Sequence, residues 1–191
     1  NLPVMKTNLT LGFLSVLLWT AVACKPSPNQ ESTEATQETE MSPSLSFSME
    51  PKSDSNVQGT ATFTAKDSVV AFHIELTGLT PGVHAIHLHE TADCSAADGT
   101  STGGHWNPTF ENHGSWGSAE GFHRGDIGNL TADESGKAQL HFETNLWCLD
   151  CEDPVKNIMG KAIIVHQGID DLVTQPTGNA GARVSCTGII Q

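Results

Sequence analysis

The sequence predicts an all-β fold, an eight-stranded Greek-key barrel or sandwich with two long functional loops. Short stretches alternate apolar and polar residues, and no long stretch repeats with the period of a helix. The 191 residues include 18 glycines, as expected of a chain with many turns.

The first 43 residues are expected to lie outside this fold. Residues 1–24 resemble an export signal, because a lysine precedes an apolar stretch at 9–22 that is too short for a comfortable membrane span. The segment Ala21-Val22-Ala23-Cys24 is similar to a bacterial lipobox, in which the cysteine is lipidated. Ordinary cleavage with Cys24 left as an odd thiol is the alternative. Residues 25–43 are polar and predict a disordered tether.

Residues 44–191 form the single predicted domain. Its expected strands, in chain order, are 44–50, 56–64, 70–77, 83–89, 127–132, 137–143, 161–166 and 184–190. The strand at 70–77 has the clearest alternation, with one apolar and one polar face. Strands 127–132 and 137–143 are predicted to pair as a hairpin. The two aperiodic stretches, 91–124 and 167–182, are long enough to be functional loops.

The net charge and the number of cysteines indicate which partners are excluded and whether disulfides are expected. The formal net charge is −13 and no basic stripe is present, which excludes nucleic acid as a partner. Four cysteines follow Cys24, namely Cys94, Cys148, Cys151 and Cys186. An even number in an exported protein suggests two disulfides.

Two histidines at alternate positions of one strand indicate a metal site. His87 and His89 leave the same face of the strand at 83–89, so both imidazoles can bind one copper or zinc ion. Alone this pair has low specificity, but further potential ligands follow, namely His105, His113, His123, Asp126 and His166. A single carboxylate among histidines fits tetrahedral zinc. The set is too large for one site and suits two.

The remaining histidines differ from this set. His73 and His141 fall on the polar phase of their strands and are expected to face solvent. His84 has the opposite parity to the metal pair and is expected to pack or to support a ligand. Gly125, between His123 and Asp126, is expected to permit a sharp turn.

Several separated motifs, in the correct order, resemble the copper/zinc superoxide dismutase family over residues 44–191. They are His87-Leu88-His89-Glu90, Gly104-His105-Trp106-Asn107-Pro108, His123-Arg124-Gly125-Asp126-Ile127-Gly128-Asn129, Val165-His166 with Asp170-Asp171-Leu172, and Gly178-Asn179-Ala180-Gly181-Ala182-Arg183.

The resemblance implies two metals and the dismutation of superoxide to dioxygen and hydrogen peroxide. The implied copper ligands are His87, His89, His105 and His166; the implied zinc ligands are His105, His113, His123 and Asp126. His105 would bridge the two metals, leave copper when copper is reduced, and carry a proton. Arg183 would draw the anion to copper.

The resemblance also implies supporting contacts. Asp170 would link His87 and His113, and a Cys94–Cys186 disulfide would tie the first long loop to the last strand. Between His166 and Arg183 the chain carries no lysine, arginine or glutamate, so long-range steering of the anion by this loop is weak.

Cys148 and Cys151 depart from the family pattern. A local structural disulfide is the favoured interpretation in an oxidising compartment. A redox-active or soft-metal-binding dithiol is the alternative.

The sequence also permits other functions, and it gives expectations for the cellular location and the oligomeric state. A non-catalytic copper store or copper-delivery module on the same fold is one alternative, and a structural β-sandwich with incidental histidines is another. We expect a bacterial periplasmic or cell-envelope protein whose only membrane contact is an N-terminal lipid anchor. A homodimer stays one option for its oligomeric state.

Overall fold

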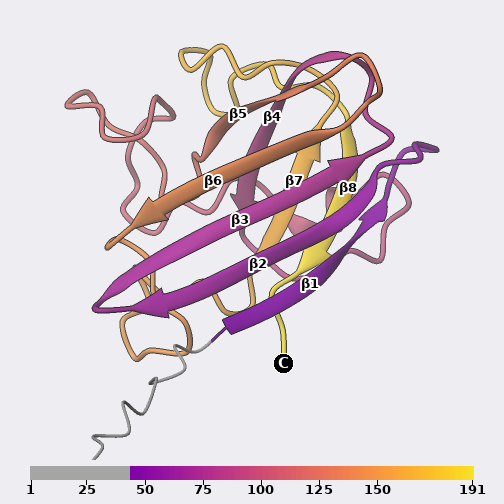
Figure 1. The fold of residues 1–191 in the computed structure, drawn as a ribbon. Coiled ribbons are helices and arrows are strands. Elements are labelled where there is room, and N and C mark those ends of the chain that lie inside the picture. Colours follow the sequence, from indigo (N-terminus) through magenta and orange to yellow (C-terminus); the bar gives the residue numbers. More distant parts are fainter. Residues whose placement is uncertain (1–43) are drawn as a thin grey trace, which may run out of the picture. The chain divides into compact units, whose positions relative to one another are not determined.

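Eight antiparallel strands form one sheet that curls into a nearly closed barrel (Figure 1). This architecture comes from a computed structural model that describes residues 44–191. The strands are β1 Ser44–Pro51, β2 Gln58–Lys66, β3 Val69–Thr77, β4 Gly82–His89, β5 Gly128–Ala132, β6 Ala138–Thr144, β7 Ala162–His166 and β8 Arg183–Gly188. The predicted all-β fold class is confirmed. The predicted signal segment with Cys24 and the predicted tether lie outside the described residues.

Neighbouring strands follow the order β5-β4-β7-β8-β1-β2-β3-β6. Between residues 44 and 191 the only helical segment is the short 3₁₀ turn Thr100–Thr102, η1. No helix in that range has the length and apolarity to cross a membrane. Strands β1, β2, β3 and β6 form one side of the barrel, and β5, β4, β7 and β8 form the other (Figure 1).

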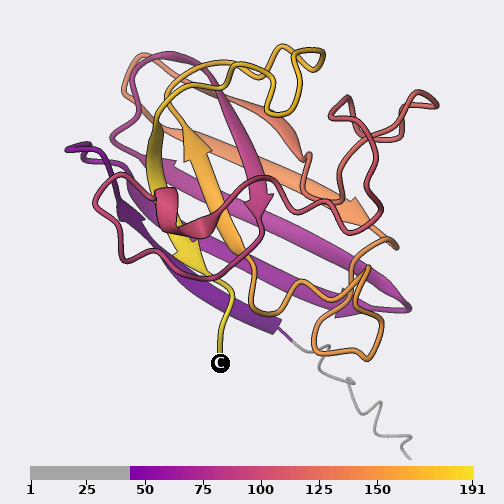
Figure 2. The same ribbon diagram turned by 180° about the vertical axis from the view of Figure 1, so that it is seen from behind.

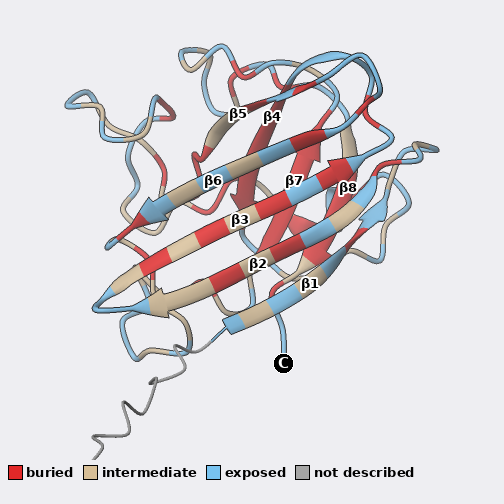
Figure 3. Ribbon diagram, in the orientation of Figure 1, coloured by how far each residue is buried: buried red, intermediate tan, exposed pale blue. Residues whose placement is uncertain are grey.

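The core fills the space between these two sides. Along β3, Phe72, Ile74 and Leu76 are buried and alternate with residues that are less buried (Figure 3). Phe63 stacks on Phe72 with ring centroids 4.8 Å apart, and Trp147 meets both rings edge-on. The apolar residues of the alternating sequence therefore face the core, and the polar residues between them face solvent.

Strand β4 lacks this alternation because both of its faces are covered. Every residue from His84 to His89 is buried, and β7 is buried along its whole length. Ile86 and Leu88 face the barrel core. The long β4–β5 connection lies over the outer face of this side (Figure 2). A strand covered on both faces can present histidines in a water-excluded place.

The predicted hairpin between 127–132 and 137–143 is wrong. The tight turn forms, with Asp133 N–H donating to Lys137 O at 2.8 Å, but the two strands then diverge. Strand β5 pairs with β4, and β6 pairs with β3, so they are the two ends of the sheet. The chain crosses from one side of the barrel to the other at this turn.

Two disulfides secure the connections. Cys94 of the β4–β5 connection is joined to Cys186 of β8. Cys148 is joined to Cys151 within the β6–β7 connection, which is the interpretation that the sequence favours.

Candidate metal centre

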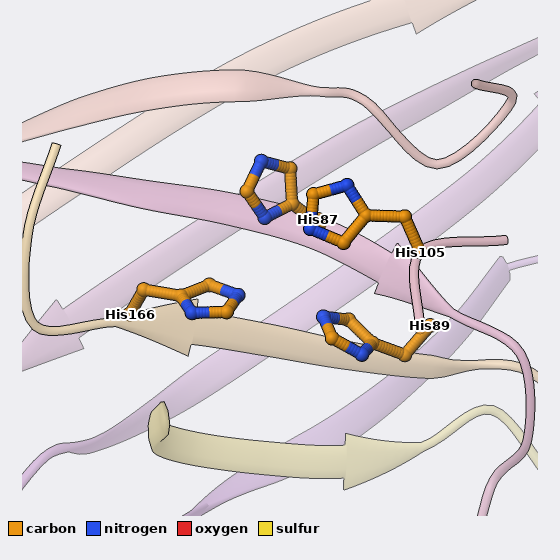
Figure 4. Close-up of side chains that lie close together, drawn as sticks. All are labelled: His87, His89, His105 and His166. Carbon is orange, nitrogen blue, oxygen red and sulfur yellow. The ribbon is translucent and has the colours of Figure 1, made fainter. Parts of the chain in front are cut away.

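Four histidines from three parts of the chain converge outside the barrel core. His87 and His89 come from β4, His166 from the end of β7, and His105 from the β4–β5 connection (Figure 4). Their candidate ligand atoms all lie within 4.8 Å of one another. None of the four side chains is more than 4% exposed. The predicted copper ligands are thus brought together.

A second cluster lies within the β4–β5 connection and shares one member with the first. It consists of His105, His113, His123 and Asp126, whose candidate ligand atoms also lie within 4.8 Å of one another. All four are buried. The predicted zinc ligands therefore also meet, with His105 between the two clusters.

Backbone bonds hold this connection against β4. Trp106 N–H donates to Leu88 O at 2.8 Å, and Leu88 N–H donates to Gly125 O at 2.9 Å. The expected turn at Gly125 is present, since Asp126 N–H donates to His123 O at 3.1 Å, but Gly125 does not have positive φ. Glycine is needed because a Cβ at this position would collide with the Leu88 carbonyl. Close packing therefore brings the ligands on this connection to β4.

Unpartnered nitrogens test whether these residues suit metal ions. Among the described residues, four buried nitrogens of the first cluster have no hydrogen-bond partner, namely His87 Nδ1, His89 Nε2, His105 Nε2 and His166 Nε2. A buried polar atom without a partner is costly. In the second cluster, His113 Nδ1 and His123 Nδ1 lie 3.0 and 3.3 Å from the Asp126 carboxylate, so three potential ligands are turned toward one another. Both clusters therefore fit a metal ion.

The opposite ring nitrogens are held by the surrounding chain. His87 Nε2 lies 2.8 Å from Asp170 Oδ2, and His113 Nε2 lies 2.9 Å from Asp170 Oδ1. His89 Nδ1 bonds Gly103 O at 2.9 Å, and a similar bond joins His166 to a backbone carbonyl. An N–H that donates to an oxygen fixes the tautomer and leaves the other nitrogen's lone pair for a metal.

Burial and neighbouring charges tune the protonation of the clusters. Burial lowers the pKa of His105 to about 4, despite its bond to Asp126, and burial together with His87 lowers the pKa of His166 to about 3. Burial also opposes the charge on His113, but contacts with Asp126 and Asp170 raise its pKa to about 9. The depressed values keep His105 and His166 neutral near pH 7, which is the form that binds metal.

Arg183, at the start of β8, lies beside the loop of the first cluster. Its Nη1 donates to Gly99 O at 2.7 Å and to Thr102 Oγ1 at 2.8 Å. Its Nη2 donates to Gly103 O at 2.8 Å, and Gly103 O also accepts from His89. These bonds use three of the five guanidinium donors. The same carbonyl therefore anchors both the arginine and one candidate ligand.

Several residues that support the two ligand clusters were not predicted from the sequence. Gly178 has φ +62°, and a Cβ there would collide with Asp170 and His113. Asn129 clamps the backbone of Asp170 by two hydrogen bonds of 2.8 and 3.0 Å. Trp147 Nε1 donates to the carbonyl of Arg124, beside His123, at 2.8 Å. Gly178 and Asn129 stand inside the family motifs, so their positions in those motifs could have indicated a supporting role. Trp147 lies outside the motifs, and nothing in the sequence indicated its contact.

The other three histidines lie as expected. His84 is buried, with Nδ1 2.8 Å from His166 O and Nε2 2.8 Å from Thr80 O, so it supports the backbone of a candidate ligand. His73 and His141 lie on the outward face of β3 and β6, where their side chains are 45% and 61% exposed.

The fold and the two clusters define a class: an antiparallel β-barrel with two adjacent histidine-rich metal sites. The particular family follows from comparison with known proteins. Residues 57–190 match the model of the family described as copper/zinc superoxide dismutase. The chain belongs to this family.

Named relatives and solved structures agree with this assignment. The chain is 38% identical over 148 residues to "Superoxide dismutase [Cu-Zn] 2" of Mesembryanthemum crystallinum, covering 72% of this chain and 88% of the relative. It is 36% identical over 145 residues to "Superoxide dismutase [Cu-Zn]" of Deinococcus radiodurans, covering 71% and 78%. A crystal structure of a double mutant of a SOD-like protein from Bacillus subtilis has a TM-score of 0.68 and 30% identity, covering 76% of this chain and 97% of that one. The clock protein EA4 has a TM-score of 0.67 and 31% identity, covering 78% and 96%.

Proposed function

We propose that this chain is a copper/zinc superoxide dismutase, which converts two superoxide anions and two protons into dioxygen and hydrogen peroxide. The observation that carries the proposal is the pair of buried ligand clusters that share His105, with four unpartnered imidazole nitrogens in the first of them. Copper would be held by His87, His89, His105 and His166, and zinc by His105, His113, His123 and Asp126.

Copper supplies the one-electron chemistry when it is bound, because its oxidation state can change and that of zinc cannot. The chain's residues prepare the substrate and the proton. His105 Nδ1 lies 2.9 Å from Asp126 Oδ1, whereas Nε2 faces the first cluster without a partner. Because its low pKa keeps His105 neutral near pH 7, a proton taken up at Nε2 would pass readily to the peroxide product.

Arg183 orients the anion in this proposal. Its bonds to the 99–103 segment fix the guanidinium while two N–H donors remain for superoxide. The positive charge of Arg183 is close to the first cluster. Salt screens the more distant charges that make up the net charge of −13, so the nearby guanidinium dominates the field that the anion meets there.

Metal analysis combined with a superoxide-consumption assay tests this function. The purified mature protein is expected to hold one copper and one zinc per chain and to consume superoxide. Copper bound without turnover would support a copper store or delivery module. A protein that binds neither metal would support a structural β-sandwich.

We also propose that the chain is exported to the bacterial cell envelope and lipid-anchored through Cys24. The apolar stretch before Cys24 and the two disulfides, which suit an oxidising compartment, support this proposal. Mass spectrometry of the mature N-terminus should find a lipidated Cys24, and the Cys24→Ser variant should leave the membrane fraction.

The oligomeric state is a separate question. Sedimentation equilibrium of the Cys24→Ser variant in the absence of detergent tests whether the chain forms a homodimer.

A further inference from the structure

Two histidines lie opposite each other on the outward face of the barrel, on the side formed by β1, β2, β3 and β6. His73 of β3 and His141 of β6 are direct partners in the antiparallel register. Opposite residues in such a pair project to the same side of the sheet. Both side chains are exposed, and their ring centroids lie 6.4 Å apart. The copper/zinc centre uses neither residue.

Each of these histidines has a carboxylate two residues further along its strand. Glu75 Oε1 lies 3.7 Å from His73 Nε2, and Glu143 Oε1 lies 3.0 Å from His141 Nε2. Strand periodicity places all four side chains on one face. We call His73, Glu75, His141 and Glu143 the outer histidine patch.

The spacing of the two rings suits a shared metal ion. Their centroid separation of 6.4 Å equals that between His87 and His89 of the buried cluster. Since the outer rings are exposed, rotation of their side chains can bring both Nε2 atoms to one ion. Imidazole and carboxylate are ligands that zinc and copper accept.

The residues around the patch leave its side chains available to a cation. The cross-strand partners of the patch residues, apart from the two histidines themselves, are uncharged: Thr60, Thr62, Ala71 and Gln139. No lysine or arginine stands among these partners to compete for the carboxylates. Exposed polar contacts contribute little to stability, so exchanging the histidine–glutamate contacts for metal bonds costs little.

We propose that the outer histidine patch binds one divalent ion of the copper or zinc class through His73 and His141, with carboxylate and water completing its coordination. This site is separate from the copper/zinc centre. Its ligands are already in solvent, so binding needs no opening of the protein. The ion should exchange readily with the solution, in contrast to ions at the buried clusters.

Titration of the metal-loaded protein with Cu²⁺ near neutral pH tests the proposal. Calorimetry is expected to show one further ion per chain, and electron paramagnetic resonance should show two nitrogen ligands. The His73→Asn/His141→Asn double variant should lose this ion. The single His73→Asn variant should bind it at least about tenfold more weakly. Gln139→Ala, which alters a neighbouring residue on the same face, should bind it as the unaltered chain does.

A second measurement needs no variant. Zn²⁺ added to the metal-loaded protein should shift the imidazole resonances of His73 and His141 together and leave His84 unmoved. Equal binding of the further ion by the double variant, or resonances that do not respond to Zn²⁺, would overturn the proposal. The copper and zinc content measured before titration reports separately on the buried clusters.

Discussion

At the scale of single residues, Asp170 does most to join the two clusters. Its carboxylate oxygens lie 2.8 Å from His87 Nε2 and 2.9 Å from His113 Nε2, so it contacts one histidine of each cluster. The carboxylate is buried, and its interactions with these two histidines hold its pKa below the usual range, although burial opposes this. An ionised Asp170 keeps both Nε2 atoms as donors and both Nδ1 atoms free for metal.

Asp170→Asn should therefore weaken metal binding at both clusters. An amide has one acceptor oxygen and cannot accept from both imidazoles as the carboxylate does. We expect affinity to fall about 10–100-fold, as is typical when the outer partner of a ligand is lost. Competition with chelators of known affinity measures this.

The neighbouring carboxylate provides the control for that substitution. Asp171 bonds residues of its own loop, including Thr174, and is exposed. Asp171→Asn should leave both metal affinities unchanged. Equal losses in the two variants would show that the loop, and not the bridge to the histidines, matters.

Arg183→Ala should lower the rate constant for superoxide at low ionic strength while copper and zinc are retained. The guanidinium shares the Gly103 carbonyl with His89 of the first cluster, and local fields of this kind change association rates about tenfold or more. Arg183→Lys keeps a charge but loses the planar fork that bonds Gly99 and Gly103, so it should be intermediate. Pulse radiolysis at several salt concentrations measures the rate. An unchanged rate in the alanine variant would remove the assigned role.

At the scale of elements, strands could be predicted from the sequence better than connections. Alternating residues such as Phe72 and Ile74 identified β3, because the pattern is local. The hairpin prediction failed because a turn sequence does not say which strand edges meet beyond it. The contacts of His84 with His166 and of Trp147 with Arg124 join residues distant in the chain, so no local pattern contains them.

The two disulfides should differ in their importance. Cys94 and Cys186 are 92 residues apart, whereas Cys148 and Cys151 are 3 apart. Closing a longer loop removes more freedom from the unfolded chain, and loss of a native disulfide typically costs about 2–5 kcal/mol. Cys94→Ser/Cys186→Ser should reach this range, and Cys148→Ser/Cys151→Ser should cost clearly less.

Urea unfolding of both double variants, together with their superoxide rates, measures the difference. Cys94 lies in the same connection as Gly99 and Gly103, whose carbonyls hold Arg183. The first variant should therefore also lose rate, and the second should not. Equal losses of stability and rate would contradict this account.

At the scale of the whole molecule, the buried histidines link metal binding to stability. In the metal-free protein, the pKa of His105 is lowered to about 4 and that of His166 to about 3, from an ordinary value of 6.5. Below pH 6.5 the unfolded chain binds protons at these residues that the folded chain does not. Their stabilising contribution is therefore lost progressively as pH falls from 6.5 to about 3.

His113 has the opposite effect. Its pKa rises from 6.5 to about 9 on folding, so its contribution is complete below pH 6.5 and is lost as pH rises through about 9. The free energy of unfolding of the metal-free protein should therefore be greatest near pH 6.5 and fall on both sides.

Bound copper and zinc should change this profile, because the ions occupy nitrogens that would otherwise titrate and bind only the folded chain. Each ion raises the stability by about 4 kcal/mol when its free concentration is a thousandfold above its dissociation constant. The loaded protein should consequently be more stable and nearly flat from pH 6.5 to 9, and should lose stability sharply where protons displace the metals. Urea unfolding across this range, with and without a chelator, measures both curves. A metal-free curve that rises steadily to pH 9 would show that His113 is not held as a cation between Asp126 and Asp170.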